Sequence, residues 1–261
     1  MMYGFGNMIS PSNRLFSGGG SYNPLTTAWI ANTGEKDTYI INSLNDFETG
    51  LDTYGLKSKL LMFYPNRTGD PTKDAFDFMN NGARSQFFSS GWTLTTQGAK
   101  PNGTSAYADT NFEPRTEATL TDFSAGFSTN ENTSGVANGY DMGATGAQQF
   151  IMMSKYNANN KAYFTIDASF TPNTAVTNGD GVFIGTVNGS KLQEHYQDGA
   201  FLGSSTSTST LLVNKNVYYG AQNGPANYNN KRMRNVFIGK YLTATEVANL
   251  TNLIDALDAT R

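Results

Sequence analysis

The amino-acid sequence predicts a mainly β protein, an antiparallel two-sheet jelly-roll sandwich with one N-terminal and one C-terminal amphipathic helix. Three observations lead to this fold class. The 261 residues include 29 Asn, 31 Thr and 27 Gly, and Thr suits strands whereas Asn and Gly suit turns. Helical periodicity is largely missing from about residue 84 to residue 240. Amphipathic helical patterns flank this region on both sides.

Residues 1–24 are rich in Gly, Ser and Asn, with scattered aromatic residues. We expect an irregular arm or linker here; the alternative is an arm that becomes ordered against a partner subunit. The remaining residues, 25–261, are expected to form one jelly-roll domain. These two segments are the predicted organisation of the chain.

The first helix is predicted over about residues 37–54. Apolar residues recur there at steps of three and four, at Ile40, Leu44, Phe47, Leu51 and Tyr54. Asp37 is a plausible N-cap and Gly55 a plausible stop. Because the other face of this helix is polar, we expect the helix to lie against a sheet. The apolar run KLLMFYP at 59–65 then predicts a buried strand.

The sandwich is predicted over about residues 58–242. Short β-prone runs such as KAYFTIDAS and RNVFIGKYL alternate with turn pairs such as Asn178-Gly179 and Asp198-Gly199. Strands spaced by about 10 residues with such turns are typical of sandwiches and jelly rolls. The run SSTSTST at 204–210 is interpreted as a polar edge strand in preference to a low-complexity segment.

The second helix is predicted over about residues 244–258. Val247, Leu250, Ile254 and Leu257 share one face. Thr243 followed three residues later by Glu246 has the spacing of a capping box.

Composition excludes several functional classes. The formal net charge of −3 and the absence of a Lys/Arg run argue against a nucleic-acid surface. No cysteine is present, and a single histidine excludes a histidine cluster for metal. The N-terminus lacks the pattern of a signal peptide, and no run approaches the length of a membrane span. No cofactor is expected.

Several segments in order resemble a group of bacteriophage virion surface proteins. They include SKLLMFYPNRTGD, GWTLTTQGAKPNG, GVFIGTVNGSKLQEHYQDG, VYYGAQNG and RMRNVFIGKYLTATEVANL, from about residue 37 to the end. The ending with Gly239, Leu242, Thr243 and Glu246 is similar to that of concanavalin A-like, laminin-G-type jelly rolls. The match is weak before residue 25.

The resemblance implies a protein of the virion surface, as a spike, head fibre or receptor-binding subunit. Residues 1–24 would then contact other virion proteins of the capsid, penton or tail. A homo-oligomer is expected, and a trimer is assigned by analogy with spikes. A host-surface glycan is the external partner considered, and oligomerisation would strengthen such a weak contact through multivalency.

The single histidine, His195, lies beside Glu194 and near Asp198, which suggests a catalytic group at first sight. However, Asp198-Gly199 predicts a tight hairpin that pairs Tyr196 with Phe201 and His195 with Leu202. His195 and Glu194 then point to opposite faces. We therefore interpret His195 as a surface or strand residue without a functional role.

Paired carboxylates with the spacing of a glycosidase strand are not found. The closest pattern is ADTNFEP, where Asp109, Asn111 and Glu113 alternate. We interpret this segment as a polar strand edge; a calcium site at Asp109 and Asn111 is the alternative. No catalytic residue is assigned.

Glycan contact needs an aromatic platform with amides or carboxylates around it. The candidates are Trp92 and Tyr107, and the loop with Asn227, Tyr228 and Asn229. The alternative for that loop is a turn with Tyr228 packed on the rim. The predicted function is a non-enzymatic virion subunit for host attachment or capsid decoration. The alternatives are a virion-associated glycan depolymerase and a cellular lectin module.

Overall fold

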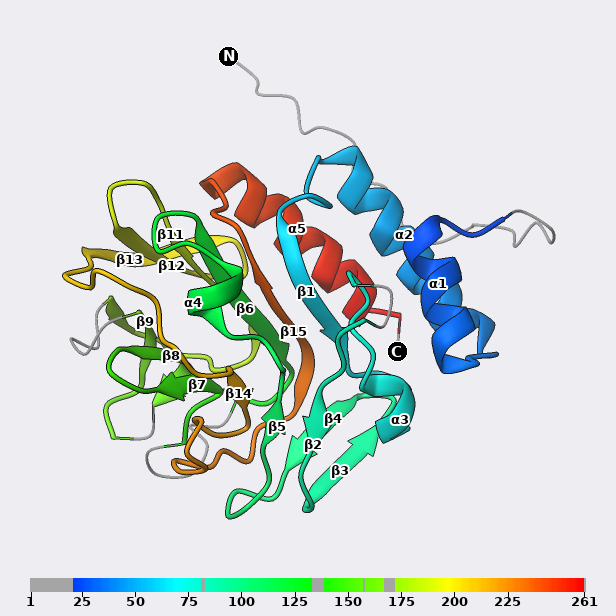
Figure 1. The fold of residues 1–261 in the computed structure, drawn as a ribbon, viewed down its shortest axis with the longest axis horizontal. Helices are drawn as coiled ribbons and strands as arrows, with labels where there is room; N and C mark the ends of the chain where they lie inside the picture. The colour runs from blue at the N-terminus through cyan, green and yellow to red at the C-terminus, as the bar shows by residue number, and fades with distance from the viewer. Residues whose placement is uncertain (1–20, 81–82, 133–138, 157, 167–171, 261) are drawn as a thin grey trace.

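The computed structural model describes residues 21–80, 83–132, 139–156, 158–166 and 172–260. These residues form two antiparallel sheets packed face to face, with helices layered on one side (Figure 1). The predicted mainly β sandwich is confirmed. Most of the predicted arm, residues 1–20, lies outside the described residues.

The described strands divide into two sheets. The first sheet has the order β13-β12-β11-β6-β15-β4-β3, and β1 also pairs with β15. Its strands are β13 Ala200–Thr206, β12 Leu192–Gln197, β11 Gly181–Val187, β6 Phe123–Thr129, β15 Met233–Gly239, β4 Gly98–Pro101, β3 Trp92–Thr95 and β1 Leu60–Pro65. The second sheet has the order β10-β9-β8-β7-β14-β5-β2. Its strands are β10 Asn173–Ala175, β9 Lys161–Thr165, β8 Gln149–Tyr156, β7 Met142–Thr145, β14 Tyr218–Tyr219, β5 Ala108–Asp109 and β2 Phe87–Phe88.

The main core lies between the two sheets. It is rich in phenylalanine, and Phe123 of the first sheet meets Phe150 of the second edge to face, with centroids 5.8 Å apart. Within the first sheet, Phe127 and Phe183 stack at 5.6 Å. Alternate residues of each strand point into this layer, as the period of two of a β-strand requires.

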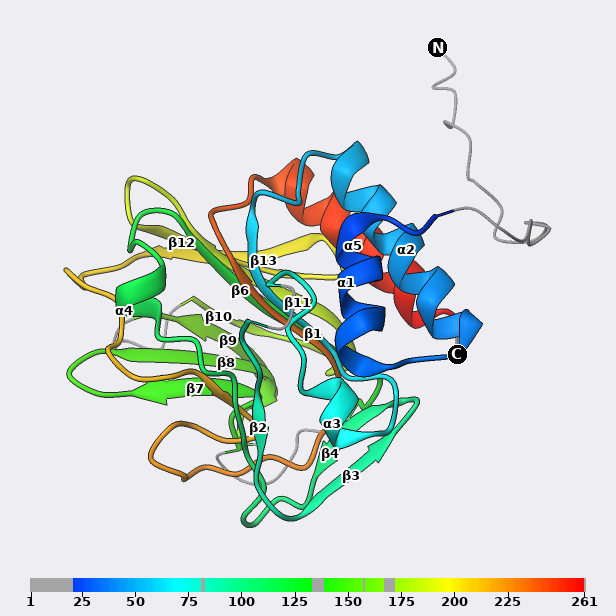
Figure 2. The ribbon, with the colours of Figure 1, turned by 45° about the vertical axis from the view of Figure 1, so that its right-hand side comes forward.

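A second core covers the other face of the first sheet. The long helices α1 (Pro24–Thr33), α2 (Thr38–Thr53) and α5 (Ala244–Asp258) pack there (Figures 1 and 2). Phe47 of α2 stacks on Phe63 of β1 at 4.6 Å. The helix predicted over 37–54 and its N-cap are confirmed, because the Asp37 side chain accepts a hydrogen bond from the N–H of Tyr39. The predicted strand at 59–65 is confirmed as β1.

The C-terminal helix is also confirmed. The Thr243 side chain accepts from the N–H of Glu246, whose carboxylate accepts from the N–H of Thr243. The run 204–210 is strand only up to Thr206, where β13 ends. Two further short helices, α3 (Pro71–Asp74) and α4 (Pro114–Glu117), occur in connections.

Helix α1 is a long helix that the sequence does not predict; it precedes the predicted N-terminal amphipathic helix, which is α2. Asn23, at its N-cap position, makes no side-chain capping bond. Instead, Glu48 of α2 accepts hydrogen bonds from the N–H groups of Leu25 and Thr26 at 3.0 and 2.9 Å. The free donors at this helix end are thus satisfied by a carboxylate 22 or 23 residues away.

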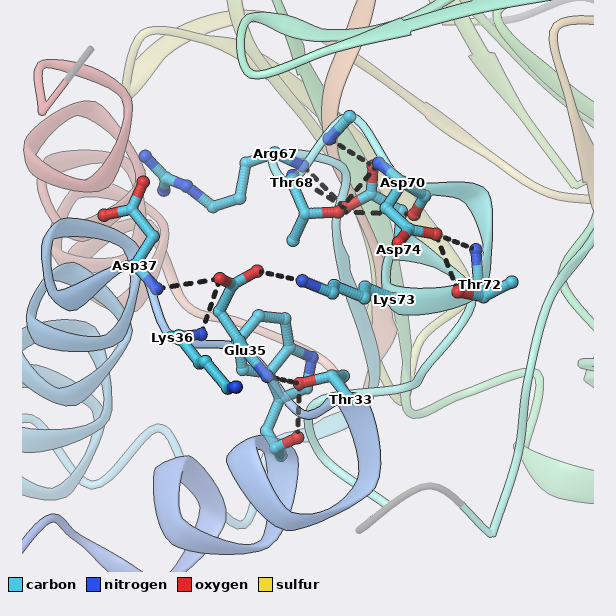
Figure 3. A network of polar contacts seen from close by, with 12 residues as sticks. Thr33, Glu35, Lys36, Asp37, Arg67, Thr68, Asp70, Thr72, Lys73 and Asp74 are labelled. Atoms are coloured by element: carbon cyan, nitrogen blue, oxygen red, sulfur yellow. Dashed lines mark hydrogen bonds and ion pairs between the residues drawn. The ribbon is translucent and has the colours of Figure 1, made fainter.

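Polar contacts fasten the helical layer to the sandwich. Figure 3 shows Glu35, between α1 and α2, accepting from the N–H groups of Lys36 and Asp37 at 2.7 and 2.8 Å. Lys73 of α3 approaches the same carboxylate at 3.3 Å.

Asp74, also in α3, is 1% exposed and accepts hydrogen bonds from the N–H groups of the loop that follows β1. Burial raises the pKa of Asp74 to about 6.

The His195 hairpin forms at the predicted turn. Asp198 and Gly199 both have positive φ, 50° and 74°, as a type I′ turn requires. Tyr196 pairs with Phe201 as predicted, but His195 lies opposite Gly203, because a bulge shifts the register by one residue. His195 lies in a strand as expected; it is 1% exposed, so the surface interpretation is wrong.

None of the helices in the described part of the chain has both the length and the hydropathy of a membrane-spanning helix.

Candidate functional site

The outer face of the second sheet is the broad face on the side of the sandwich away from the long helices. The first sheet is covered on both sides, by the second sheet and by α1, α2 and α5. Figure 2 shows these helices on one side of the sandwich and strands β7 to β10 on the other. Side chains that point outward from the second sheet therefore face away from the helical layer.

One row of paired residues crosses this outer face. It runs through Ile151, Gly143, Tyr218, Asp109 and Phe87, each opposite the next on neighbouring strands. Ile151 is 1% exposed, whereas Phe87 is 57% exposed. Gln222 covers Gly143, since a Cβ on that glycine would lie 3.1 Å from the Gln222 Cβ. The open part of the face thus lies over β14, β5 and β2.

Aromatic rings form one half of this open part. Tyr107 precedes Asp109 by two residues and lies on the same face of the chain. Its ring stacks on that of Tyr218, with centroids 4.7 Å apart and planes 6° apart. Both rings are half-buried, and Phe87 adds a largely exposed ring at the end of the row. Such rings offer a flat apolar surface with a polar handle on each tyrosine.

Polar groups form the other half. Asp109 Oδ1 accepts the N–H of Asn111 at 2.8 Å, and its Oδ2 accepts Asn216 Nδ2 at 3.3 Å. Asn223 Nδ2 in turn donates to the Asn216 carbonyl at 2.9 Å. Asp109 is half-buried and Asn111 exposed. These contacts hold one carboxylate and several amides at the edge of the rings.

The hydroxyl of Tyr218 remains protonated in this environment. Burial, followed by the charges of Asp109 and Tyr107, raises the pKa of Tyr218 to about 12. The site therefore offers a phenolic donor beside a carboxylate acceptor. Together with the exposed ring of Phe87, this pair can stack a ligand ring and exchange hydrogen bonds with its hydroxyl groups.

Trp92 supports this site from beneath. Its Nε1 donates to the Tyr107 carbonyl at 3.1 Å. The indole meets Tyr219 and Phe88 edge to face at 5.3 and 5.4 Å, as part of the inner core. Trp92 is half-buried and fixes the backbone of Tyr107, and its contact with a ligand stays a prediction.

The predicted loop at 227–229 follows Ala226, which bridges to Gln222, the residue that covers Gly143 of the row. Asn227 has φ of 52°, and its carbonyl accepts the N–H of Tyr140 at 2.9 Å. Tyr228 is half-buried. Asn229 is 1% exposed, and its side chain donates to Asp141, so it offers no surface to a ligand.

Asn229 belongs to a buried polar cluster that sequence reasoning missed. Lys231 is 2% exposed, and its Nζ lies 3.6 Å from Asp141 Oδ2 and 2.6 Å from Ser154 Oγ. Burial lowers the pKa of Lys231, against the raising effect of Asp141. The cluster ties the segment before β15 to β7 and β8, and so links the two sheets.

The predicted calcium alternative involves Asp109 and Asn111. Asn111 has φ of 53°, so the segment ADTNFEP is not extended there and its polar residues do not alternate on one side. Among the described residues, no group of three or more His, Cys, Asp or Glu side chains is arranged to hold a metal ion.

A cavity of about 220 Å³ near α4 contains two carboxylates, Glu117 and Asp122. Both groups have structural partners. Glu117 pairs with Arg84 and also accepts from the N–H of Glu113, and Asp122 accepts from the N–H of Tyr241 at 2.8 Å. The two carboxylates that line this cavity therefore stabilise the connections around α4.

Some residues named in the sequence analysis lie at the open face. Tyr107 is named there as an aromatic residue and Asp109 as part of a polar strand edge, and Trp92 lies beneath them. The sequence missed Phe87 and Tyr218, because β2 and β14 contain two residues each and carry no periodic signal. Their contact depends on pairing with β5 from distant parts of the chain.

No family model and no curated protein matches the chain. Solved structures share its fold. A mutant of Trypanosoma rangeli sialidase displaying trans-sialidase activity superposes with a TM-score of 0.56 at 15% identity, over 83% of this chain and 39% of the sialidase. The chain therefore spans about two fifths of that enzyme.

Two further structures have the same sandwich. Domain 4 of AbnA, an extracellular arabinanase from Geobacillus stearothermophilus in complex with arabinotriose, gives a TM-score of 0.50 at 14% identity. The match covers 74% of this chain and 98% of that domain. The binding domain of botulinum neurotoxin DC, in complex with rat synaptotagmin II, gives 0.53 at 15% identity over 75% and 52%. None of these three is a phage protein, and at such identities they establish the two-sheet fold alone.

Proposed function

We propose that the protein binds carbohydrate, without catalysis, through the open part of the second sheet formed by Phe87, Tyr107, Asp109 and Tyr218. The observation that carries this proposal is the register row that places an exposed ring, a carboxylate and a tyrosine pair side by side. Sugars present apolar C–H faces that pack on aromatic rings, and hydroxyl groups that exchange hydrogen bonds with carboxylates and amides.

The shared fold supports the same conclusion. The arabinanase domain matches this chain over 98% of its own length and was solved with a trisaccharide bound. A fold alone does not determine function, because sites are carried on folds. Sugar binding is therefore inferred from the aromatic rings and the carboxylate of the open face, and the shared fold adds support to it.

The setting we propose is the surface of a phage particle, as an attachment or decoration subunit and as a trimer. The support for it is the ordered set of sequence segments that resembles phage virion proteins. Detection of the chain in purified particles by mass spectrometry, and its molar mass by light scattering, test these two points separately from sugar binding.

The test of sugar binding is a glycan array followed by calorimetry with the best ligand. Tyr218→Ala and Phe87→Ala should each weaken binding about tenfold or more, as expected for aromatic contacts at the centre of an interface. Phe201→Ala is the matched control, because Phe201 is 55% exposed, close to the 57% of Phe87, and lies on β13 of the other sheet. Equal losses in Phe87→Ala and Phe201→Ala, or no loss in Tyr218→Ala, would show that sugar binds elsewhere.

A further inference from the structure

Within the described part of the chain, the Asp109 carboxylate of the open site forms no ion pair. Arg84 is the cation that precedes Phe87 by three residues, and its side chain is 13% exposed. Its guanidinium is already engaged by Asp77 and Glu117.

The hydrogen bonds of Asp109 come from neutral groups. They are donated by the N–H of Asn111, the amide of Asn216 and the hydroxyl of Tyr218. None of these donors neutralises the carboxylate. The same charge raises the pKa of the Tyr218 hydroxyl, second to burial, so its field reaches the ring that a ligand would touch. A hydroxyl donor approaching this site is attracted, whereas a second anion is repelled.

We infer that this site selects neutral glycans over glycans that carry carboxylate groups. This inference rests on the proposed function and specifies its ligand class. A sugar carboxylate stacked on Tyr218 or Phe87 would lie near Asp109 and would lose hydration without gaining a cationic partner. A neutral sugar at the same place donates its hydroxyl groups to that carboxylate.

The experiment compares one oligosaccharide in two charge states. The tightest neutral ligand from the array is oxidised at its primary hydroxyl groups, which converts them into carboxylates and leaves the ring stereochemistry unchanged. Calorimetry with both forms is carried out at low and high salt. We expect the oxidised form to bind about tenfold more weakly at low salt, and the difference to shrink at high salt because salt screens the repulsion.

Two variants locate the charge responsible. Asp109→Asn keeps the size of the side chain and removes its charge, so the difference between the two forms should largely disappear. Asp52→Asn is the control, because Asp52 is 53% exposed and lies on α2 in the helical layer. That variant should keep the full difference.

The outcomes separate this inference from the proposed function. Equal binding of both forms, tighter binding of the oxidised form, or an array with only acidic ligands would overturn the selectivity and leave sugar binding intact. A difference that persists in Asp109→Asn would also overturn it. Binding to no glycan on the array would overturn the proposed function itself.

Discussion

His195 lies between two phenylalanine rings of the core, with its centroid 6.2 Å from that of Phe164 and 6.1 Å from that of Phe183. Neither ring nitrogen has a hydrogen-bond partner in the described structure. Burial lowers the pKa of His195 to about 3. The histidine that resembles a catalytic group in the sequence is therefore a neutral ring in an apolar layer.

This burial predicts a pH-dependent stability. The unfolded chain binds a proton on His195 as the pH falls below about 6.5, while the folded chain does not until about pH 3. Stability linked to His195 is thus present above pH 6.5 and is lost as the pH falls from there. Relative to His195→Leu, the wild type should lose roughly 3 kcal/mol of unfolding free energy between pH 7.5 and pH 4.

Chemical denaturation of both proteins across that range measures the difference, and the subtraction removes the contribution of carboxylates common to both. At neutral pH, His195→Leu should be about 1 kcal/mol more stable, because two unpaired buried nitrogens are removed. A wild type and variant with parallel pH profiles would contradict the neutral, buried state of this ring.

The loop between β1 and α3 depends on one carboxylate. Asp74 accepts from the N–H groups of Arg67, Thr68 and Gly69 at 3.0, 2.9 and 3.2 Å. Asp74→Asn turns one of the two acceptor oxygens into a donor that faces these N–H groups. We expect a loss of about 2–3 kcal/mol, measured by denaturation. Asp70→Asn is the control. One side-chain oxygen of Asp70 caps α3 by accepting the N–H of Thr72, and asparagine keeps an oxygen that can do the same.

The buried pair of Lys231 and Asp141 should be costly to break. Lys231→Met leaves the Asp141 carboxylate buried without its cation, and should destabilise the fold by about 3 kcal/mol or more. Lys240→Met, at an exposed lysine after β15, should change stability by less than about 0.5 kcal/mol. Similar melting temperatures for the two variants would show that the Lys231 charge is not needed.

The capping box of α5 gives a smaller effect. Thr243→Ala removes the acceptor for the N–H of Glu246 and should cost about 1 kcal/mol. Thr245→Ala, two residues further into the helix and also exposed, removes no cap and should be close to neutral. Thermal denaturation of the pair distinguishes them.

Elements whose signals are local in sequence were predictable. Helices α2 and α5 each have an apolar stripe in their own residues and an N-cap residue directly before them. The turn at Asp198-Gly199 is formed by two residue types that tolerate the positive φ it requires. Helix α1 was not predictable, because the group that satisfies its N-terminus is Glu48 in the next helix.

Aromatic and amide residues are the candidates for ligand contact named in the sequence analysis. The structure places one of the aromatic residues, Tyr107, on the open face beside Tyr218. Trp92 and Asn229 are partly or wholly enclosed because β3 and the segment before β15 fold against the core, which composition does not reveal. Phe87 and Tyr218 meet only through pairing with Asp109.

Helices α1 and α5 are the first and last described elements, and both lie on the side of the sandwich away from the second sheet's outer face (Figures 1 and 2). A tether joined to either end of the described chain would attach the molecule by the side of the sandwich that carries α1, α2 and α5. Tyr218 and Phe87 would then be presented outward, which is the orientation that a biosensor chip or an array of copies requires for capture from solution.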